Sequence, residues 1–311
     1  MNWLYITLGI VGGVILLVLL TSLICFFKVF YSPKRKPIDP EHFDIPPGGE
    51  YESHRDQIIA WTKGAREMPH EEICITAYDG FRLVGYYYEY KAGAPMEIIF
   101  HGYKGNADRD LAGGVFRCHS IGRNALVVDQ RASGKSEGRV ITFGIKERRD
   151  AISWANYVSE RFGADTEVII TGVSMGAATV VMAAAEELPS CVKSVVADCG
   201  YTSAREIIRL IIAKMHLPVS ILYPFVRLGA FIFGGFRLEE RSPIDVIGNV
   251  KLPIIFVHGD GDTFVPCEMS ERLHSLCPTK TALHIVKGAA HGLAYPDDIS
   301  GYEKALLDFY K

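Results

Sequence analysis

The chain has 311 residues, 49% of them hydrophobic, and a net charge of −3, which suffices for one large core and an appended segment. Because there is no basic excess, a nucleic-acid partner is not expected. The seven cysteines show no C-x-x-C spacing, and several lie in apolar runs. We therefore interpret them as reduced thiols in a cytosolic compartment and not as a disulfide framework.

The first segment, from Trp3 to Phe27, contains no charged residue. About twenty helical residues cross the ~30 Å hydrocarbon core of a bilayer, so this run predicts one membrane-spanning helix. A secretory signal would have positive charge before the run and a small-residue cleavage site after it, and neither is present. Basic residues follow instead, at Lys28, Lys34, Arg35 and Lys36. By the positive-inside rule they place the rest of the chain in the cytoplasm.

Gly9 and Gly13 of this run form a G-x-x-x-G pattern, which is typical of a helix dimer face. Because glycine is common in membrane helices in any case, the pattern leaves the oligomeric state unknown. Five prolines between residues 32 and 49 then indicate a stiff linker. A helix is expected from Tyr51 to Arg66.

Two stretches that alternate apolar and polar residues, 71–78 and 82–90, flank Asp79-Gly80, which is a strong hairpin signal. From there strands and helices are predicted to alternate. The strands are expected at 96–100, 124–129, 167–171, 192–197, 253–258 and 281–286, and the helices near 108–120 and at 145–161, 175–187, 267–276 and 299–310. A hairpin followed by such repeats predicts an α/β fold with a mostly parallel central sheet and helices on both faces.

The alternation is interrupted between about residues 201 and 250, where prolines and glycines break up two apolar stretches. A second membrane span is the alternative interpretation, but Arg209, Lys214 and Arg227 interrupt any run of the required length. An insertion this apolar must cover another apolar surface. We therefore expect a helical cap over the functional site.

The stretch from Val168 to Ala177 begins with β-branched residues, which are typical of a buried parallel strand, and leads into a helix of small residues. Between them lies Gly172-Val-Ser174-Met-Gly176. A G-x-S-x-G between strand and helix forms a nucleophile elbow, in which the serine is exposed at the positive end of the helix dipole. Its two glycines are required because the turn is strained and its neighbours pack closely. Ser174 is therefore the candidate nucleophile.

A serine nucleophile needs a base and an orienting carboxylate. Among ten histidines, His291 lies in a small-residue loop after the last predicted strand, where parallel sheets carry their chemistry. The carboxylate is expected after the penultimate strand, where Asp260 and Asp262 compete and the residues alone leave both open. This stretch does not match a calcium loop, because Phe264 and Val265 occupy ligand-loop positions five and six.

The order of serine, aspartate and histidine resembles that of the α/β-hydrolase superfamily, and the sequence is identified as a member of it. The D-x-x-V-P at residues 262–266 is similar to the superfamily's aspartate motif and favours Asp262. His101-Gly-Tyr-Lys-Gly-Asn106 resembles its oxyanion loop. Residues 129–136 resemble its D-x-R-G-x-G-x-S turn, with Ala132 where glycine is usual. The resemblance covers residues 68–311 and points to membrane-anchored bacterial hydrolases of the serine-aminopeptidase and monoacylglycerol-lipase-like branch.

The resemblance implies that Ser174 attacks an acyl carbonyl, that His291 takes its proton, and that Asp262 fixes the imidazole tautomer. The backbone N–H groups of Met175 and Tyr103 would hold the oxyanion. Met175 also follows from the elbow, because the residue after the nucleophile opens the helix with an unpaired N–H. Tyr103 rests on the analogy alone.

No cofactor and no metal are expected. Gly134-Lys-Ser136 lacks the glycine at position 129 that a phosphate loop requires, since that residue is Asp129. The histidines and cysteines do not fall at zinc-site spacing.

The sequence thus predicts a single-pass serine hydrolase of the cell membrane with a cytoplasmic catalytic domain. It would cleave a carboxylic ester bond of a small acyl substrate, and the apolar insertion favours a lipid-derived one. The alternatives are a peptidase or amidase acting on short peptides, and a catalytically silent, membrane-tethered binding protein. The expected parts are a transmembrane anchor (1–31), a juxtamembrane linker and helix (32–67) and an α/β-hydrolase domain (68–311) with the cap at about 201–250.

Overall fold

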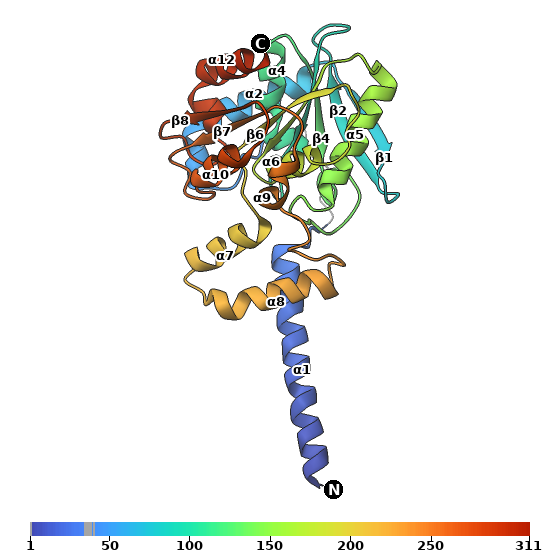
Figure 1. The fold of residues 1–311 in the computed structure, drawn as a ribbon, viewed down its shortest axis with the longest axis vertical. Helices are drawn as coiled ribbons and strands as arrows, with labels where there is room; N and C mark the ends of the chain where they lie inside the picture. The colour runs from blue at the N-terminus through green and yellow to red at the C-terminus, as the bar shows by residue number, and fades with distance from the viewer. Residues whose placement is uncertain (1, 34–38, 40) are drawn as a thin grey trace.

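A long N-terminal helix projects from a mixed body of strands and helices in this structure, a computed structural model that describes residues 2–33, 39 and 41–311 (Figure 1). Three of the four basic residues that orient the predicted span, Lys34, Arg35 and Lys36, lie outside the described residues. So do Pro37 and Pro40 of the predicted linker. The N-terminus lies at the free tip of this helix, and the C-terminus lies on the opposite side of the body (Figure 1).

An eight-stranded sheet organises the described part of the body, with strand order β1-β2-β4-β3-β5-β6-β7-β8. β2 runs antiparallel to β1 and to β4, and the remaining neighbours are parallel. The predicted α/β fold with a mostly parallel sheet is therefore confirmed. The strands are β1 Glu71–Thr76, β2 Arg82–Tyr88, β3 Met96–Phe100, β4 Asn124–Asp129, β5 Val168–Val173, β6 Val192–Asp198, β7 Ile254–Gly259 and β8 Thr281–Val286.

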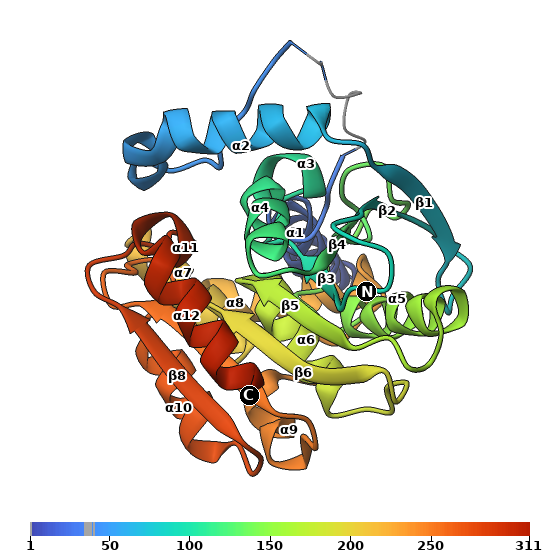
Figure 2. The same cartoon turned by 90° about the horizontal axis from the view of Figure 1, so that it is seen from above.

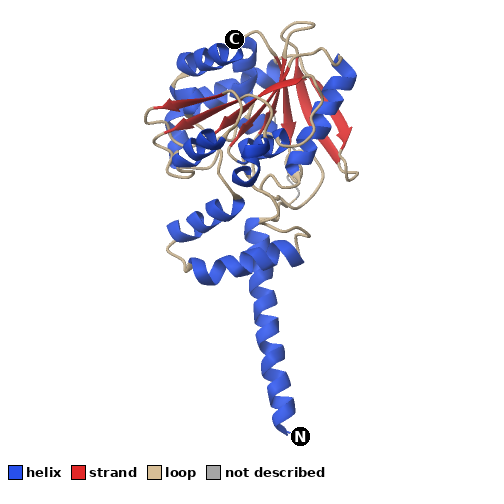
Figure 3. Ribbon diagram, in the orientation of Figure 1, coloured by secondary structure: helices blue, strands red, loops and turns tan. Residues whose placement is uncertain are grey.

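Helices account for the rest of the regular structure (Figure 3). They are α1 Asn2–Val29, α2 Arg55–Glu67, α3 Ala107–Asp110, α4 Ala112–Ser120, α5 Glu147–Phe162, α6 Met175–Ala184, α7 Ala204–Lys214, α8 Val219–Ile232, α9 Pro243–Val246, α10 Glu268–Leu276, α11 Ala294–Asp297 and α12 Ile299–Tyr310, with 3₁₀ turns η1 Gly49–His54 and η2 Ile247–Asn249. The predicted helix at 108–120 is divided at Leu111. The weak helix propensity of Gly113-Gly114 accompanies this break, and the two glycines pack against Trp61 and Ile99.

Helices cover both faces of the sheet because the strand residues alternate between two apolar surfaces. In β3, Ile98 packs in the cluster that contains residues of α5 and α6, whereas Ile99 packs in the cluster under α2 and α4. On the side of α2 and α4, α11 and α12 cover β5, β6 and β7. Seen from above, the sheet lies between these two helical layers (Figure 2). The carboxyl ends of its central strands open toward α7, α8 and the end of α1.

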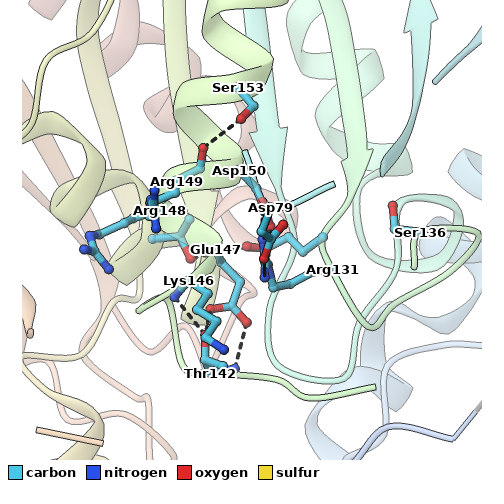
Figure 4. A network of polar contacts seen from close by, with 12 residues as sticks. Asp79, Arg131, Ser136, Thr142, Lys146, Glu147, Arg148, Arg149, Asp150 and Ser153 are labelled. Atoms are coloured by element: carbon cyan, nitrogen blue, oxygen red, sulfur yellow. Dashed lines mark hydrogen bonds and ion pairs between the residues drawn. The ribbon is translucent and has the colours of Figure 1, made fainter. Parts of the chain in front are cut away.

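The turn after β4 is closed by a network of buried charges (Figure 4). Arg131 donates to both carboxylate oxygens of Asp150 at 2.6 Å and to Asp79 of the β1–β2 turn at 2.9 Å. Glu147 accepts from the backbone N–H and the hydroxyl of Thr142 at 2.7 and 2.5 Å. Ala132, which stands where the superfamily has glycine, adopts φ 60°, a left-handed conformation that explains why glycine is usual there.

The C-terminal third of α1 is built into the body. Phe26 and Phe30 are 6% and 0% exposed, and the Phe30 ring lies 5.8 Å from the ring of Phe143. The chain then continues as a short antiparallel bridge, in which Tyr31 pairs with Val140. By contrast, most side chains from Trp3 to Leu20 are exposed. This helix is the one in the described residues that is long and apolar enough to cross a membrane.

The insertion between β6 and β7, residues 201–250, supplies α7 and α8, which lie between the sheet and the free part of α1 (Figure 1). α8 crosses α1 at close range, because a Cβ atom at Gly229 would lie 2.5 Å from the carbonyl oxygen of Ser22. Residues of α1, α7 and α8 share one apolar cluster with Phe143 and Met175. The end of the N-terminal helix and the insertion therefore form a single packed unit above the sheet.

Candidate active site

Ser174 occupies a strained turn between β5 and α6. Its backbone has φ 56° and ψ −112°, a conformation that costs on the order of 1–3 kcal/mol outside glycine. The neighbouring glycines make this turn possible. A Cβ atom at Gly172 would lie 2.0 Å from the carbonyl oxygen of Gly176, and one at Gly176 would lie 2.1 Å from that of Phe100. The elbow thus has the local structure that the sequence predicts.

His291 lies in the loop between β8 and α11, and its ring joins the two other predicted side chains. Its Nε2 is 2.9 Å from Ser174 Oγ, and its Nδ1 is 2.6 Å from Asp262 Oδ2. An ionised carboxylate can only accept, so Nδ1–H donates to Asp262 and Nε2 of the neutral ring accepts from the serine hydroxyl. The structure therefore brings Ser174, His291 and Asp262 into one line of hydrogen bonds.

Asp262 is fixed by several donors besides His291. Its Oδ1 accepts from the backbone N–H groups of Phe264 and Val265, both at 2.8 Å, and its Oδ2 lies 3.2 Å from His258 Nε2. Burial raises the pKa of Asp262, but the hydrogen bonds from His258, His291 and Val265 outweigh burial and hold this pKa well below its ordinary value. The carboxylate is therefore ionised wherever the protein is folded near neutral pH.

Asp260, the competing aspartate, lies elsewhere. It is exposed, and its Oδ1 accepts from the backbone N–H of Gly288 at 2.5 Å. That bond joins the β7 loop to the β8 loop and thus holds together the two segments that carry Asp262 and His291. Asp262 is accordingly the aspartate that contacts the imidazole.

The two predicted oxyanion residues flank Ser174. Met175 is the first residue of α6, where backbone N–H groups have no partner within the helix. Tyr103 lies in the loop after β3, and this loop abuts the elbow, since a Cβ atom at Gly102 would lie 3.4 Å from the Cβ atom of Ser174. The Tyr103 hydroxyl donates to the carbonyl oxygen of Val29 at 2.6 Å. The end of α1 thereby contacts the loop that carries a predicted oxyanion donor.

His101 has a structural position in this loop. Its Nε2 accepts from the backbone N–H of Gln130 at 3.0 Å, and its Nδ1 lies 2.7 Å from the carbonyl oxygen of Gly102. The Gln130 amide returns a 2.6 Å bond to the carbonyl oxygen of His101. This histidine therefore joins the loops after β3 and β4.

Sequence reasoning missed His258 and Tyr51. His258 lies at the end of β7, and its Nε2–H is shared between Asp262 and the carbonyl oxygen of Val265 at 2.9 Å, while its Nδ1 lies 2.7 Å from the Ser270 hydroxyl. The Tyr51 hydroxyl donates to the carbonyl oxygen of His291 at 2.8 Å. The signal for His258 was its place directly before the aspartate loop, whereas nothing near Tyr51 in the sequence marked it.

Cys199 is a third neighbour that the sequence did not single out. Its sulfur, an oxygen of Asp262 and a nitrogen of His291 lie within 4.8 Å of one another, which is a possible donor set for a metal ion. Both ring nitrogens of His291 are already engaged, with Asp262 and with Ser174. Burial raises the pKa of the Cys199 thiol well above its ordinary value, so it is a poor metal ligand and a poor nucleophile. The set therefore fits a chain of hydrogen bonds better than a metal site.

The fold and the elbow define the chain as an α/β hydrolase, which confirms the superfamily resemblance. More narrowly, it belongs to the dienelactone hydrolase family, whose model matches residues 128–307. The chain is an enzyme of this hydrolase class.

Similar proteins agree with this assignment. YqkD of Bacillus subtilis (strain 168) is 26% identical over 244 residues, which span 78% of this chain and 80% of the relative. The Schizosaccharomyces pombe protein bem46 is 24% identical over 265 residues, or 80% and 82% of the two chains. The lysophosphatidylserine lipase ABHD12 of Danio rerio is 23% identical over 205 residues, or 63% and 50%.

Solved structures share the fold. The Pyrococcus furiosus esterase Pf2001 superposes with a TM-score of 0.64 at 22% identity and covers 89% of this chain and 98% of its own. The esterase Est1E of Butyrivibrio proteoclasticus, solved with ferulic acid bound, gives a TM-score of 0.57 at 21% identity, with 76% and 99% covered.

Proposed function

We propose that this enzyme is a serine hydrolase that cleaves carboxylic esters through an acyl-enzyme, with Ser174, His291 and Asp262 as its catalytic triad. The observation that carries the proposal is the continuous line from Ser174 Oγ to His291 at 2.9 Å and from His291 to Asp262 at 2.6 Å. A hydroxyl, an imidazole and an ionised carboxylate in this order activate a serine for attack on an acyl carbonyl.

In this mechanism His291 Nε2 takes the proton of Ser174 as Oγ attacks the carbonyl carbon. Asp262 stays ionised and stabilises the imidazolium that forms. The oxyanion accepts hydrogen bonds from the backbone N–H groups of Met175 and Tyr103. His291 then gives its proton to the leaving alcohol, and water, activated by the same imidazole, hydrolyses the acyl-enzyme.

A peptidase or amidase would use the same residues. Ester hydrolysis is favoured by the apolar residues around the proposed triad. Met175 and Tyr103 adjoin an apolar cluster formed by the insertion and the end of α1, which suits an acyl chain better than a charged peptide. No cofactor is needed for either reaction. A catalytically silent binding protein would have no use for the strained serine or for the ionised carboxylate behind the imidazole.

Labelling with a fluorophosphonate probe, followed by hydrolysis of p-nitrophenyl esters of increasing chain length, tests this function. The wild-type protein should be labelled and should hydrolyse at least one ester of the series. Ser153→Ala is the matched control, because Ser153 is half-buried on α5 and its hydroxyl donates to the carbonyl oxygen of Arg149 in the same helix. A protein that neither binds the probe nor cleaves any ester would contradict the proposal.

We also propose that α1 is a retained membrane anchor, residues 1–31, followed by a juxtamembrane part (32–67) and a hydrolase domain (68–311) with its cap at 201–250. Cleavage of α1 as a signal sequence would remove Phe26 and Phe30 from the core and the Val29 carbonyl from Tyr103. Loss of two buried aromatic side chains costs several kcal/mol, about 3–5 each by analogy with truncation to alanine.

The proposed orientation places the hydrolase domain in the cytoplasm, on the basis of Lys28 and the three basic residues of 34–36. The free cysteines in the described residues are consistent with a reducing compartment. Protease added outside intact cells should leave the domain whole, and lysis should make it cleavable. Digestion in unlysed cells would reverse the orientation.

A further inference from the structure

The outward face of α8 is mostly apolar, with Arg227 as its one exposed charge. Its exposed apolar residues recur at helical spacing and include Ile221, Pro224, Phe231 and Ile232. Ile221 is 59% and Phe231 is 55% exposed. The opposite side of the helix is buried against the body, through residues such as Tyr223 and Ala230. Neighbouring exposed apolar side chains on one helix face indicate a surface that binds a membrane or another protein.

The position of α8 along α1 selects the membrane. α8 meets α1 at Ser22 and Phe26, where the Gly229 backbone makes its closest approach. From Trp3 to Ser22 an α-helix rises about 28 Å, which matches the ~30 Å hydrocarbon core of a bilayer. If this stretch fills the core, α8 lies at its surface. Figures 1 and 3 show α8 lying across α1, as a helix in the plane of a membrane would.

Residue types at the two ends of this stretch agree with that placement. Trp3 and Tyr5 are exposed at the far end of α1, where aromatic residues mark a membrane–water interface. The exposed charges near α8 include the cations Lys28, Lys214 and Arg227 and one nearby carboxylate, Glu239. Arg227 lies 3.6 Å from Glu239, and Lys214 donates to the carbonyl oxygen of Thr263. Such cations beside an apolar helix face suit anionic lipid head groups.

We propose that the exposed face of α8 is a membrane-binding surface that lies in the same leaflet that α1 leaves, and that the enzyme takes an amphiphilic ester from this leaflet. The inference rests on the proposed anchoring and ester hydrolysis. The buried side of α8 supports the second part, because Tyr223 and Val226 belong to the apolar cluster that reaches Met175 and Tyr103. The same apolar cluster thus reaches from α8 to the residue that follows the proposed nucleophile.

Quenching by brominated lipids tests the position of the face in the full-length protein. Phe231→Trp is compared with Leu307→Trp in vesicles whose acyl chains carry bromine near the head group. Leu307 is exposed on α12, at the opposite end of the molecule from α1 (Figure 1). The fluorescence of the wild-type protein, which comes from its own tryptophans, is subtracted from that of each variant. Phe231→Trp should lose about half of its added fluorescence and Leu307→Trp almost none. Equal quenching of the two variants would overturn the proposal. A dimer in which the second copy covers this face, with no quenching of Phe231→Trp, would also overturn it.

Hydrolysis tests the supply of substrate. The double variant Ile221→Ser/Phe231→Ser should hydrolyse a vesicle-embedded long-chain ester about fivefold more slowly, and a water-soluble acetate ester at the wild-type rate. Leu307→Ser should change neither. Equal loss on both esters would contradict membrane delivery. Absence of hydrolysis by the wild-type protein would instead remove the proposed function, and the quenching result would still decide where α8 lies.

Discussion

Two buried carboxylates in this enzyme, Asp150 and Asp262, accept hydrogen bonds from different kinds of side chain. Asp150 and Asp262 are both buried, and each accepts short hydrogen bonds. Asp150 faces the guanidinium of Arg131 at 2.6 Å, whereas Asp262 faces the imidazoles of His291 at 2.6 Å and His258 at 3.2 Å. The first cluster joins a turn to a helix (Figure 4). The second ends at Ser174.

The side chain that donates to the carboxylate decides what each cluster can do. Burial lowers the pKa of the Arg131 guanidinium, but the hydrogen bonds and charges of Asp150 and Asp79 raise it above its ordinary value, so this cation never releases a proton. An imidazole exchanges its proton near neutral pH. A buried carboxylate paired with arginine is therefore a permanent ion pair with a structural role. One paired with histidine, with a serine on the other ring nitrogen, can support proton transfer.

The largest effect is expected when Ser174, the last residue of the Asp262 cluster, is replaced. Ser174→Ala should reduce kcat for an ester by about 10⁶-fold, as in other triads. The free energy of unfolding should change by about 1 kcal/mol or less, because only one hydrogen bond, to the half-buried ring of His291, is lost. Ester hydrolysis and denaturant unfolding measure the two quantities. Probe labelling that persists in Ser174→Ala would identify another nucleophile.

The next effect separates the two aspartates of the β7 loop. Asp262→Asn should lower kcat by about 10⁴-fold, because an amide stabilises the wrong tautomer of His291. Asp260→Asn should lower it by less than about tenfold, since Asp260 bonds to a backbone N–H and not to the ring. Steady-state kinetics of both variants decide the point. If the larger loss belonged to Asp260→Asn, that residue would be the orienting carboxylate.

The parts of the fold and site that the sequence could predict are those with local signals. The strand bounds 96–100, 124–129 and 281–286 agree with the structure, because buried parallel strands are runs of apolar residues between breakers. The elbow at Ser174 is a motif of five residues in a strand–helix context. His291 was identified from its place after the last strand.

The remaining parts depend on contacts between distant segments. His258 lies inside an apolar run, and its place before the aspartate loop does not by itself show that Asp262 folds back onto its ring. The bond from Tyr51 to His291 joins residues 240 positions apart. Phenylalanine side chains such as Phe26 and Phe30 are equally suited to contact lipid or a protein core. Composition alone therefore could not show that the predicted span ends inside the enzyme.

The Arg131 cluster is broken by Arg131→Met. This change leaves Asp150 buried without its cation, and it should lower the free energy of unfolding by about 3–5 kcal/mol. Activity per folded molecule should stay near the wild-type value, because Arg131 contacts no residue of the proposed triad. Arg149→Gln, on the exposed side of α5, is the control and should cost less than about 1 kcal/mol. Denaturant titrations measure both, and equal small losses would show that the cluster is not a structural joint.

The depressed pKa of Asp262 predicts a pH dependence of stability. A carboxylate whose folded pKa lies below its unfolded value of about 3.9 stabilises the fold above that value. The stabilisation is lost as pH falls toward the folded pKa. The difference in unfolding free energy between the wild-type protein and Asp262→Asn should therefore be on the order of 2–3 kcal/mol at pH 7 and should shrink below pH of about 4. A difference that stays constant from neutral to acid pH would contradict an ionised, stabilised Asp262.

The smallest effect tests the contact between the end of α1 and the loop after β3, which carries the proposed oxyanion donor Tyr103. Tyr103→Phe removes the hydroxyl bond to the Val29 carbonyl and keeps the ring that packs 5.2 Å from Phe143. Loss of one such bond is worth about 1 kcal/mol, so kcat should fall by about three- to tenfold if the bond positions the Tyr103 N–H. KM should change little.

Tyr201→Phe is the matched control for this variant. Tyr201 is buried, and its hydroxyl donates to the carbonyl oxygen of Phe143 at 3.1 Å. It therefore loses a comparable bond in the same apolar cluster without touching the oxyanion loop. Both variants should lose similar stability, because each leaves a carbonyl oxygen without its partner. Only Tyr103→Phe should lose kcat. An equal loss of kcat in the two would mean that the end of α1 supports the cluster as a whole and does not position the oxyanion donor.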